Sequence, residues 1–282
     1  MNMTTVQQAE DLIQAQARDY GTETLPLELA HGRVLAEPIG ADRDMPPFNR
    51  VTMDGIAISY RAFAAGTRSF HIAGTQAAGQ QPLNFSQPDQ CIEIMTGAAL
   101  PDTTDTVIRY EDLEITGATA NLLIEQVTPG QHIHFKGKDR RQGDIVVAPG
   151  QLIMPAITGI AASAGKTHLL VKKAPKVVII SSGDELVDVH ETPAAHQIRR
   201  SNNYTIKAVL ERHGLKADMQ HIPDEPQLTR LAIMRCLQAY DVILLSGGIS
   251  MGKFDYIPQA LEELSVAKIF HKVQQRPGKP FW

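Results

Sequence analysis

The sequence predicts a multidomain α/β protein that contains a doubly wound parallel sheet, and three features support this fold class. Beyond Pro175, strand-like and helix-like segments alternate along the chain, which is the pattern of a sheet covered by helices on both faces. The run of β-branched residues at 176–180 suits a strand that is buried on both sides. A glycine-rich turn at 246–250 then joins an apolar strand to an amphipathic stretch that is typical of a helix.

Each segment of the α/β region has a local signal. The helix at 201–213 places Ile206 and Leu210 inward, and Gly214 follows it as a helix stop. The predicted segments are strands at 176–180, 217–222, 241–245 and 268–273, and helices at 201–213, 227–238 and 255–264.

Two other kinds of sequence precede this region. Residues 4–18 predict a helix, because Thr5 and Gln8 form a capping box ahead of a helical spacing of apolar residues. Short β-like runs separated by Gly, Pro, Asp and Asn fill the stretch from 45 to 140, which is typical of a β-rich domain. A helix rich in small residues is predicted at 155–164. The predicted domains are therefore a discontinuous helical linker domain (1–44 and 141–174), an inserted β-rich domain (45–140) and an α/β domain (175–282).

Composition limits the classes of function. A chain of 282 residues with 43% hydrophobic and 21% charged residues is ordinary for a globular protein. The net charge of -4 and the pI near 6.2 disfavour a nucleic-acid-binding surface. No apolar run approaches the ~20 residues of a membrane span, and the N-terminus lacks the pattern of a signal peptide. We therefore expect a cytoplasmic protein with no membrane or nucleic-acid partner.

Cysteine and histidine give little sign of a metal centre. Cys91 and Cys236 lie in apolar segments and are expected to be reduced core thiols, because cytosolic disulfides are rare. His132 and His134 are expected to share one face of a strand. A solvated strand face is favoured over a metal site there, since no third ligand lies nearby in the sequence.

The turn at 246–250 has the properties of a phosphate site. Its glycines allow backbone N–H groups to approach an anion closely, and the N-terminus of the following helix adds a favourable dipole. Asp255 places a carboxylate beside this turn, so a divalent cation would be needed to reconcile the two negative charges.

Polar residues follow every predicted strand of the α/β region. Ligands of open parallel sheets bind beyond the carboxyl ends of the strands, which meet at one rim. Carboxylates at such a rim can hold Mg²⁺, which bridges phosphate oxygens, while Lys and Arg neutralise the remaining charge. The residues expected at this rim are Ser182, Gly183, Asp184, Glu185, Asp224, Ser246, Gly247, Gly248, Ser250, Asp255, Arg276 and Lys279.

The order of the motifs resembles the molybdopterin molybdenumtransferase family (MoeA and the related C-terminal region of gephyrin). The motifs are Pro-Pro-Phe and Met-Asp-Gly within 46–55, Met-Thr-Gly-Ala at 95–98, Gly-x-Asp at 137–139, Ser-Gly-Asp-Glu-Leu at 182–186, Ser-Asn at 201–202, the glycine-rich stretch at 246–256 and Pro-Gly-Lys-Pro at 277–280. They cover nearly the whole chain in the order of the family.

This resemblance implies a transferase that acts late in molybdenum cofactor biosynthesis. Its substrates would be molybdate and adenylylated molybdopterin, supplied by molybdopterin adenylyltransferase as a pathway partner. AMP would be released as molybdenum is placed on the dithiolene, with Mg²⁺ as the cofactor. The resemblance also implies a homodimer with a shared cleft, into which Asp54 and Asp139 would reach from the second subunit.

The resemblance assigns roles to particular residues. The implied catalytic residues are Asp54, Thr96, Asp139, Glu185, Asp224 and Asp255. Magnesium would be held by Glu185, Asp224 and Asp255. Substrate binding would involve Ser182, Gly183, Asp184, Ser246, Gly247, Gly248, Ser250, Lys272, Arg276 and Lys279.

The chain departs from the family pattern at several points. Asn49-Arg50 stands where many members have Asp-Asn, and Arg276 stands where Lys is usual, which alters the geometry of the donors. Family members continue beyond Pro-Gly-Lys-Pro into more α/β chain and a C-terminal β-domain, whereas this sequence stops at Trp282. We therefore expect a truncated chain with an incomplete α/β domain.

Two alternative functions remain open. The α/β region also resembles the molybdopterin adenylyltransferase, but that enzyme lacks a domain like the one at 45–140. A truncated chain could instead bind molybdopterin without catalysis. Consumption of ATP would indicate the first alternative, and molybdate-dependent release of AMP would exclude the second.

Overall fold

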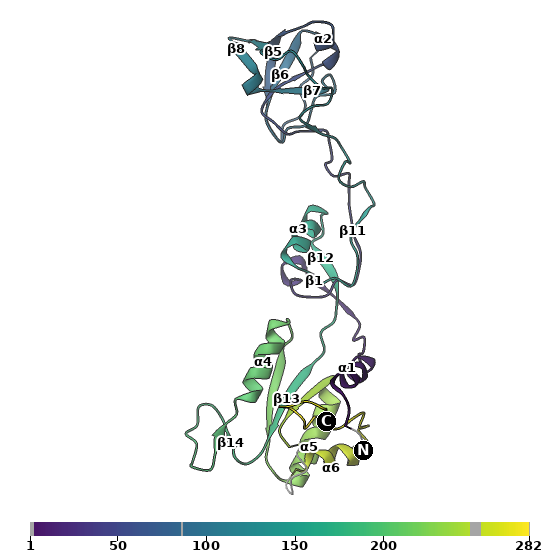
Figure 1. The fold of residues 1–282 in the computed structure, drawn as a ribbon, viewed down its shortest axis with the longest axis vertical. Helices are drawn as coiled ribbons and strands as arrows, with labels where there is room; N and C mark the ends of the chain where they lie inside the picture. Colours follow the sequence, from purple (N-terminus) through teal and green to yellow (C-terminus); the bar gives the residue numbers. More distant parts are fainter. Residues whose placement is uncertain (1–2, 86, 249–254, 282) are drawn as a thin grey trace. The chain divides into compact units, whose positions relative to one another are not determined.

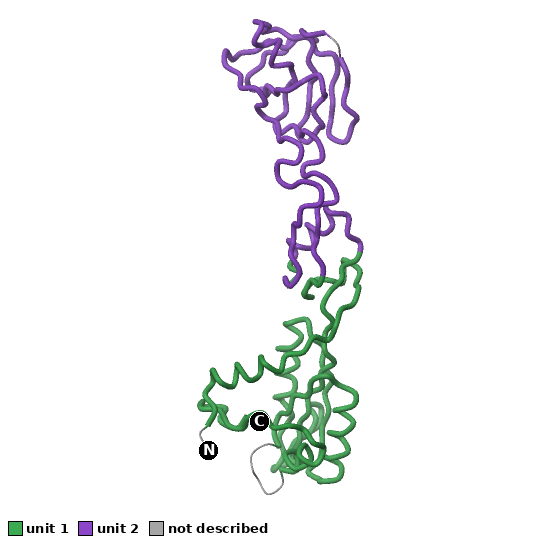
Figure 2. The backbone as a smooth tube through the Cα atoms, turned by 90° about the vertical axis from the view of Figure 1, so that its right-hand side faces the viewer, with its two compact units in different colours: residues 1–36, 152–154, 168–282 green, residues 37–151, 155–167 purple. Residues whose placement is uncertain are grey.

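The structure, a computed structural model, describes residues 3–85, 87–248 and 255–281. Its residues group into two compact units, which are coloured separately in Figure 2. Unit 1 comprises residues 1–36, 152–154 and 168–282, and unit 2 comprises residues 37–151 and 155–167. The three-domain division suggested by the sequence is finer than this grouping and stays a prediction.

Unit 1 contains the parallel sheet (Figure 1). Its helices are α1 (Val6–Ala15), α4 (Asn202–Arg212), α5 (Pro226–Ala239) and α6 (Ile257–Glu263), with a 3-10 turn η1 (Leu27–Leu29). Its strands are β1 (Thr22–Pro26), β12 (His168–Lys172), β13 (Val177–Ser182), β14 (Leu186–Val187), β15 (Ile198–Arg199), β16 (Ala217–Ile222) and β17 (Val242–Ser246). The strand order β16-β13-β17, all parallel, is that of a doubly wound sheet.

Helices cover both faces of this sheet, as predicted. Alternate residues of the central strand β13 point to opposite faces. Val177 and Ile179 pack toward α4, together with Ile206 and Leu210 of that helix. Val178 and Ile180 belong to the cluster on the other face, which α5 and α6 supply. The β-branched run is therefore buried on both sides, and the α/β multidomain class is confirmed.

The fourth predicted strand, at 268–273, is wrong. Among the described residues the segment forms only an isolated bridge between Val273 and Thr4. Lys272 has a φ of 67°, which interrupts an extended backbone. The N–H groups of Lys272 and Val273 donate to the carbonyls of Phe281 and Lys279, at 2.8 and 3.1 Å. A terminal loop thus satisfies the polar backbone groups that a neighbouring strand would have paired.

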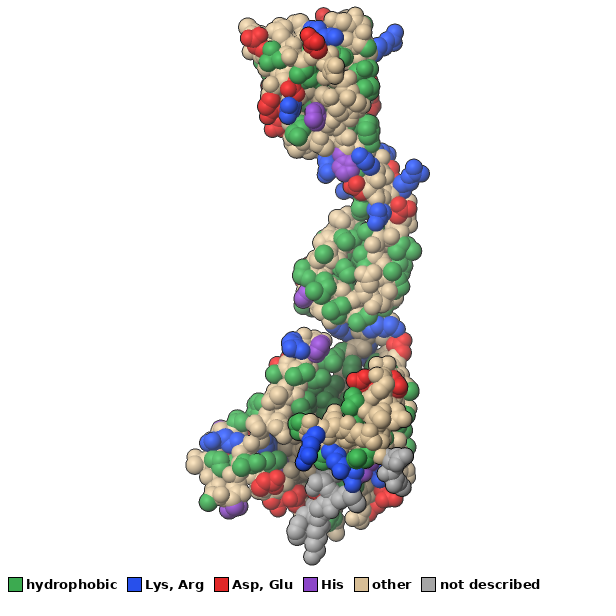
Figure 3. Space-filling model, viewed as in Figure 1, with side chains coloured by type: hydrophobic (Ala, Val, Ile, Leu, Met, Phe, Trp, Pro, Cys, Tyr) green, Lys and Arg blue, Asp and Glu red, His purple; other side chains and the backbone are tan. Residues whose placement is uncertain are grey.

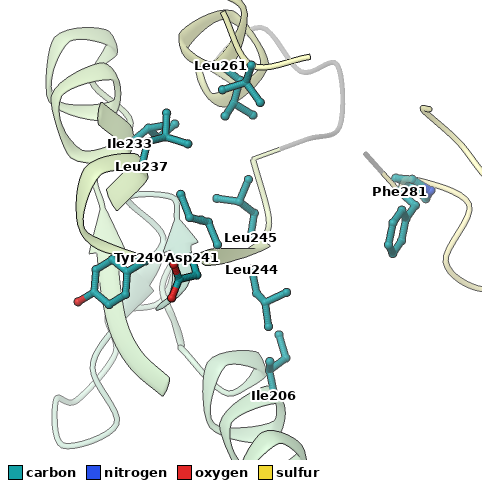
Figure 4. A pocket seen from close by; sticks show the side chains of 12 residues that line it. Ile206, Ile233, Leu237, Tyr240, Asp241, Leu244, Leu245, Leu261 and Phe281 are labelled. Carbon is teal, nitrogen blue, oxygen red and sulfur yellow. The ribbon is translucent and has the colours of Figure 1, made fainter. Parts of the chain in front are cut away.

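Strand β17 has a paired neighbour, β13, on one side only within the described residues. A cavity of about 560 Å³ lies beside it, lined mainly by hydrophobic side chains. Figure 4 shows Leu244 and Leu245 of β17 in this cavity, together with Ile206 of α4 and Leu261 of α6. Figure 3 shows a hollow lined by hydrophobic side chains in unit 1. The half-buried state of β17 follows from this open edge.

Unit 2 contains a six-stranded sheet with the order β7-β4-β6-β5-β9-β8. The strands of the whole unit are β2 (Ile39–Gly40), β3 (Arg50–Val51), β4 (Gly55–Ile58), β5 (Ser69–Gln76), β6 (Gln90–Ile94), β7 (Thr106–Arg109), β8 (Leu113–Thr116), β9 (Thr119–Leu122), β10 (Ile133–His134) and β11 (Ile145–Val147). Strands β2, β3, β10 and β11 lie outside the six-stranded sheet, in two-stranded pairs. The helices are α2 (Tyr60–Ala64) and α3 (Pro155–Ser163), with a 3-10 turn η2 (Tyr110–Asp112).

Both faces of this sheet are buried. Ile56 and Ile58 of β4 contribute to one hydrophobic cluster, and Ala57 between them contributes to another. This explains why β4 is buried at all four positions although it belongs to a largely antiparallel sheet. The predicted β-rich stretch therefore has a core of its own.

Local sequence signals elsewhere were accurate at α1 but not at His132. At α1, Gln8 N–H donates to Thr5 Oγ1 and Thr5 N–H donates to Gln8 Oε1, at 3.2 and 3.0 Å, which confirms the capping box. His132 departs from the expected strand, because its φ is 57° and β10 begins only at Ile133. No helix among the described residues is long and apolar enough to cross a membrane.

Both cysteines are buried, and this leads to a labelling prediction. Burial raises the pKa of the Cys91 thiol to about 12 and also raises that of Cys236. Since the thiolate is the reactive form, we expect the native protein at pH 8 to react very slowly with a thiol-specific reagent. Two thiols should react at once after denaturation. Fast labelling of the native protein would contradict the burial of these side chains.

Candidate active site

A cleft of about 530 Å³ lies at the carboxyl ends of the parallel strands in unit 1. We call it the rim cleft. Its lining residues are Ser182, Gly183, Glu185, Asp224, Leu245, Gly247, Gly248, Asp255 and Pro280. Three of the four carboxylates and all three glycines predicted for the rim thus line one cleft. They converge because the register of the parallel strands places Ser182 of β13 beside Ile222, and Ser181 beside Ser246.

The glycine turn after β17 packs closely on the end of β13. Gly247 and Gly248 have φ values of 97° and 68°, which other residues rarely adopt. A Cβ atom on Gly248 would collide with the side chains of Ser182 and Ile257. The backbone conformation therefore favours glycine here, and any larger residue at Gly248 would also displace the ends of the Ser182 and Ile257 side chains. Ser250, the next predicted residue of the turn, lies outside the described residues.

Two loops of the rim cleft are tied together by Asp184 and Asp224. The N–H of Asp224 donates to Asp184 Oδ1 at 3.1 Å, and the N–H of Asp184 donates to Asp224 Oδ2 at 3.4 Å. This reciprocal pair fixes the loop after β13 against the loop after β16. Asp184 therefore stabilises the two loops of the rim, whereas Asp224 both stabilises them and lines the cleft.

The carboxylates of the rim cleft have the oxygen chemistry that Mg²⁺ prefers. Within the described part of the chain, however, no group of three or more His, Cys, Asp and Glu residues is arranged to hold a metal ion. Mg²⁺ in phosphate-transfer sites is usually held by one or two carboxylates together with substrate phosphates, rather than by a cage of protein ligands alone. The rim cleft fits the arrangement in which one or two carboxylates and the substrate phosphates hold the ion together.

The basic residues predicted for the site lie on the loop that leads to Phe281. Lys272, Arg276 and Lys279 are not among the described residues that line the rim cleft, although Pro280 is.

A second cleft, of about 240 Å³, adjoins the first and was missed by the sequence reasoning. It shares Ser182, Glu185 and Gly247 with the rim cleft and adds Ser181, Leu186, Ile198, Arg199, Arg200, Ser201, Asn202, Asn203 and Ser246. Arg200 forms an ion pair with Asp188, and its Nε is buried without a hydrogen-bond partner, as is Oδ1 of Asn203. The Ser-Asn motif at 201–202 was the available signal.

His221 of β16 lies near Arg200. Burial lowers the pKa of His221, and the positive charge of Arg200 lowers it further. The imidazole is therefore neutral at pH 7, and its Nδ1 lies 3.2 Å from Ser181 Oγ.

The predicted site residues of unit 2 form two local groups. Asp54 Oδ1 accepts a hydrogen bond of 2.6 Å from the N–H of Thr96. This bond lowers the pKa of the Asp54 carboxyl below its usual 3.8, so the bond is present at neutral pH and is lost as the pH falls through that lowered value. Asp139 instead pairs with His134, at 2.9 Å between Oδ1 and Nε2.

Comparison with known proteins first gives the class of protein. Residues 178–282 match the family described as a probable molybdopterin binding domain. This is the part of the chain that holds the parallel sheet and the rim cleft.

Residues 4–165 match the MoeA N-terminal region (domain I and II). The chain belongs to the MoeA family. It is 38% identical to a molybdopterin molybdenumtransferase of Synechocystis sp., over 99% of this chain and 72% of that protein. A protein of the same name from Staphylococcus epidermidis is 30% identical, over 97% of this chain and 66% of the relative.

Solved structures agree with this family. A molybdopterin biosynthesis moeA protein from Pyrococcus horikoshii OT3 matches with a TM-score of 0.84 and 25% identity, over 99% of this chain and 71% of that chain. The chain therefore spans about two thirds to three quarters of the length of its relatives.

Proposed function

We propose that this chain takes part in molybdenum cofactor biosynthesis as a molybdopterin molybdenumtransferase. The substrates would be molybdate and adenylylated molybdopterin, and AMP would leave as molybdenum is bound by the dithiolene. The observation that carries the proposal is the rim cleft, in which Glu185, Asp224 and Asp255 lie together with the glycine turn. Family membership and the names of the relatives support it.

The lining of the rim cleft suits the cleavage of a phosphoanhydride. Backbone N–H groups at Gly247 and Gly248 suit the phosphate oxygens, because such turns approach an anion closely. Bound Mg²⁺ would supply electrostatic stabilisation of the leaving phosphate. Asp224 and Asp255 are the residues that we expect to hold it, with Glu185 nearby.

We further propose the finer features that the family resemblance implies. The chain would act as a homodimer in the cytoplasm, and a molybdopterin adenylyltransferase would supply its substrate. Asp54, Thr96 and Asp139 of unit 2 would belong to the shared site, as would Lys272, Arg276 and Lys279 of the terminal loop.

The test is molybdate-dependent release of AMP by the purified chain, with adenylylated molybdopterin and magnesium present. We expect release that requires both molybdate and magnesium. Magnesium-dependent binding of adenylylated molybdopterin without AMP release would instead assign a binding protein to these residues. Consumption of ATP with molybdopterin would indicate an adenylyltransferase, which the match to the MoeA N-terminal region disfavours.

A further inference from the structure

Arg50 and His134 form a cross-strand pair in unit 2. Strands β3 and β10 are antiparallel, and their register places His134 directly opposite Arg50. Arg50 Nη2 lies 3.2 Å from His134 Nδ1. A guanidinium group carries only hydrogen-bond donors, so Nδ1 must be the acceptor and carries no proton. This contact therefore selects one tautomer of the imidazole.

The selected tautomer places the remaining proton on Nε2 of His134. Nε2 lies 2.9 Å from Asp139 Oδ1, so the imidazole donates a hydrogen bond to that carboxylate. The contacts run in one direction, from the guanidinium through the imidazole to the carboxylate. In proteins the tautomer of a histidine is set by the bond that its other nitrogen makes, and here that bond comes from Arg50.

The loop that carries Asp139 is fastened to the segment before β3. Lys136 N–H donates to Asn49 Oδ1 at 3.0 Å, and Gly137 N–H donates to the carbonyl of Pro46 at 3.0 Å. The N–H of Asp139 itself donates to the carbonyl of Met45 at 2.9 Å. Asn49 and Arg50 are two of the residues at which the sequence departs from the family pattern. Both of them therefore contact the Asp139 loop or its histidine.

These contacts leave the Asp139 side chain 58% exposed. Within the described residues, Oδ1 is bonded to His134 and Oδ2 has no protein partner. An exposed carboxylate normally samples several rotamers, whereas here Oδ1 is held by His134 in a side chain that is largely exposed. This is the arrangement of a side chain that is positioned for a ligand.

We propose that Arg50 and His134 are positioning residues for Asp139. They fix the orientation of its carboxylate so that Oδ2 is presented to the bound substrate. The proposal rests on the proposed function in one respect, namely that Asp139 belongs to the site of molybdenum insertion.

The tautomer is tested independently of activity by the imidazole ¹⁵N chemical shifts of His134. The full chain is expected to show a proton on Nε2 and a bare Nδ1. Arg50→Met removes the donor to Nδ1, so the second tautomer should become populated. A proton on Nδ1 in the unaltered protein, or a tautomer ratio that Arg50→Met does not change, would overturn the proposal.

The positioning role is tested by the kinetics of molybdate-dependent AMP release. His134→Ala should lower kcat/KM about 10- to 100-fold, the range expected when a reacting geometry is disturbed. His134→Gln should restore most of it, because its amide can accept from Arg50 and donate to Asp139. His134→Ala combined with Asp139→Asn should be no worse than Asp139→Asn alone, since the two act as a unit.

The matched control is His132→Asn, which changes a neighbouring histidine at a φ that asparagine tolerates.

The outcomes separate the two proposals. Full activity of His134→Ala, or additive losses in the double variant, would overturn the positioning role while leaving the proposed function intact. If the unaltered chain released no AMP at all, the proposed function would fail. The ¹⁵N measurement would then still decide whether Arg50 sets the tautomer of His134.

Discussion

Asp224→Asn is expected to lower the rate of molybdate-dependent AMP release by at least ~100-fold, the usual cost of losing a preorganised electrostatic group. Asp224 lies in the loop after β16 and lines the rim cleft with Glu185 and Asp255. The substitution removes the negative charge that would hold Mg²⁺. It keeps an oxygen that can accept from the N–H of Asp184, as Oδ2 does in the structure. The fold of the rim should therefore survive.

The matched control for this variant is Asp218→Asn. Asp218 lies on β16, the strand that precedes the loop of Asp224. Its Oδ2 accepts a hydrogen bond from the hydroxyl of Tyr240 at 2.8 Å. An asparagine can still accept that bond, so turnover should stay near that of the unaltered chain. A magnesium titration adds a second readout, because Asp224→Asn should raise the magnesium concentration needed for half-maximal activity. Unchanged turnover and unchanged magnesium dependence would remove Asp224 from the metal role.

Gly55→Ala is expected to destabilise the six-stranded sheet of unit 2 by more than about 3 kcal/mol, the upper range for overpacking a core. Gly55 begins β4 and pairs with both β6 and β7. A Cβ atom at this position would collide with the carbonyl oxygen of Ile108, and it would lie 2.8 Å from Arg109 Cα. Backbone atoms of a central ladder cannot move aside as the end of a flexible side chain can. Asp54 directly precedes Gly55, so the hydrogen bond from the N–H of Thr96 to Asp54 Oδ1 should be lost as well.

The measurement is hydrogen exchange of the β4 and β7 amides, which follows unit 2 separately from the parallel sheet. Gly159→Ala is the matched control, because Gly159 lies in helix α3 of the same unit and a Cβ there meets nothing within 4 Å. Alanine in a helix is favoured over glycine by about 0.5–1 kcal/mol, so this variant should be neutral or stabilising. Equal protection of the β4 amides in the Gly55→Ala and Gly159→Ala variants would show that the close approach at Gly55 does not limit the stability of the sheet.

Much of the rim cleft could be predicted from the sequence because its parts are local. The β-branched run of β13 and the helix signals that follow it define a parallel sheet, and parallel strands bring their carboxyl ends to one rim. Glu185, Asp224 and Asp255 follow three different elements, yet the rule places them together, and the structure lines one cleft with them. The magnesium role of these residues stays a prediction.

The terminal segment shows where such local rules fail. Residues 268–273 have the composition of a strand, but strand formation also needs a neighbour with unpaired backbone groups. In the structure, Lys272 and Val273 find their hydrogen-bond partners in the loop at 279–281 and at Thr4. Composition contains no information about that competition.

The sequence by itself determined the three paired strands of the parallel sheet, the helices between them and the rim at which its carboxylates gather, because helix and strand periods, caps and glycine turns depend on neighbouring residues. The tertiary structure alone decided which groups meet across long separations. It set the tautomer of His134 through Arg50, 84 positions away, and lined the second cleft with Arg200 and Asn203. Such contacts depend on strand register and on the burial of particular atoms, which arise only when the separate segments pack.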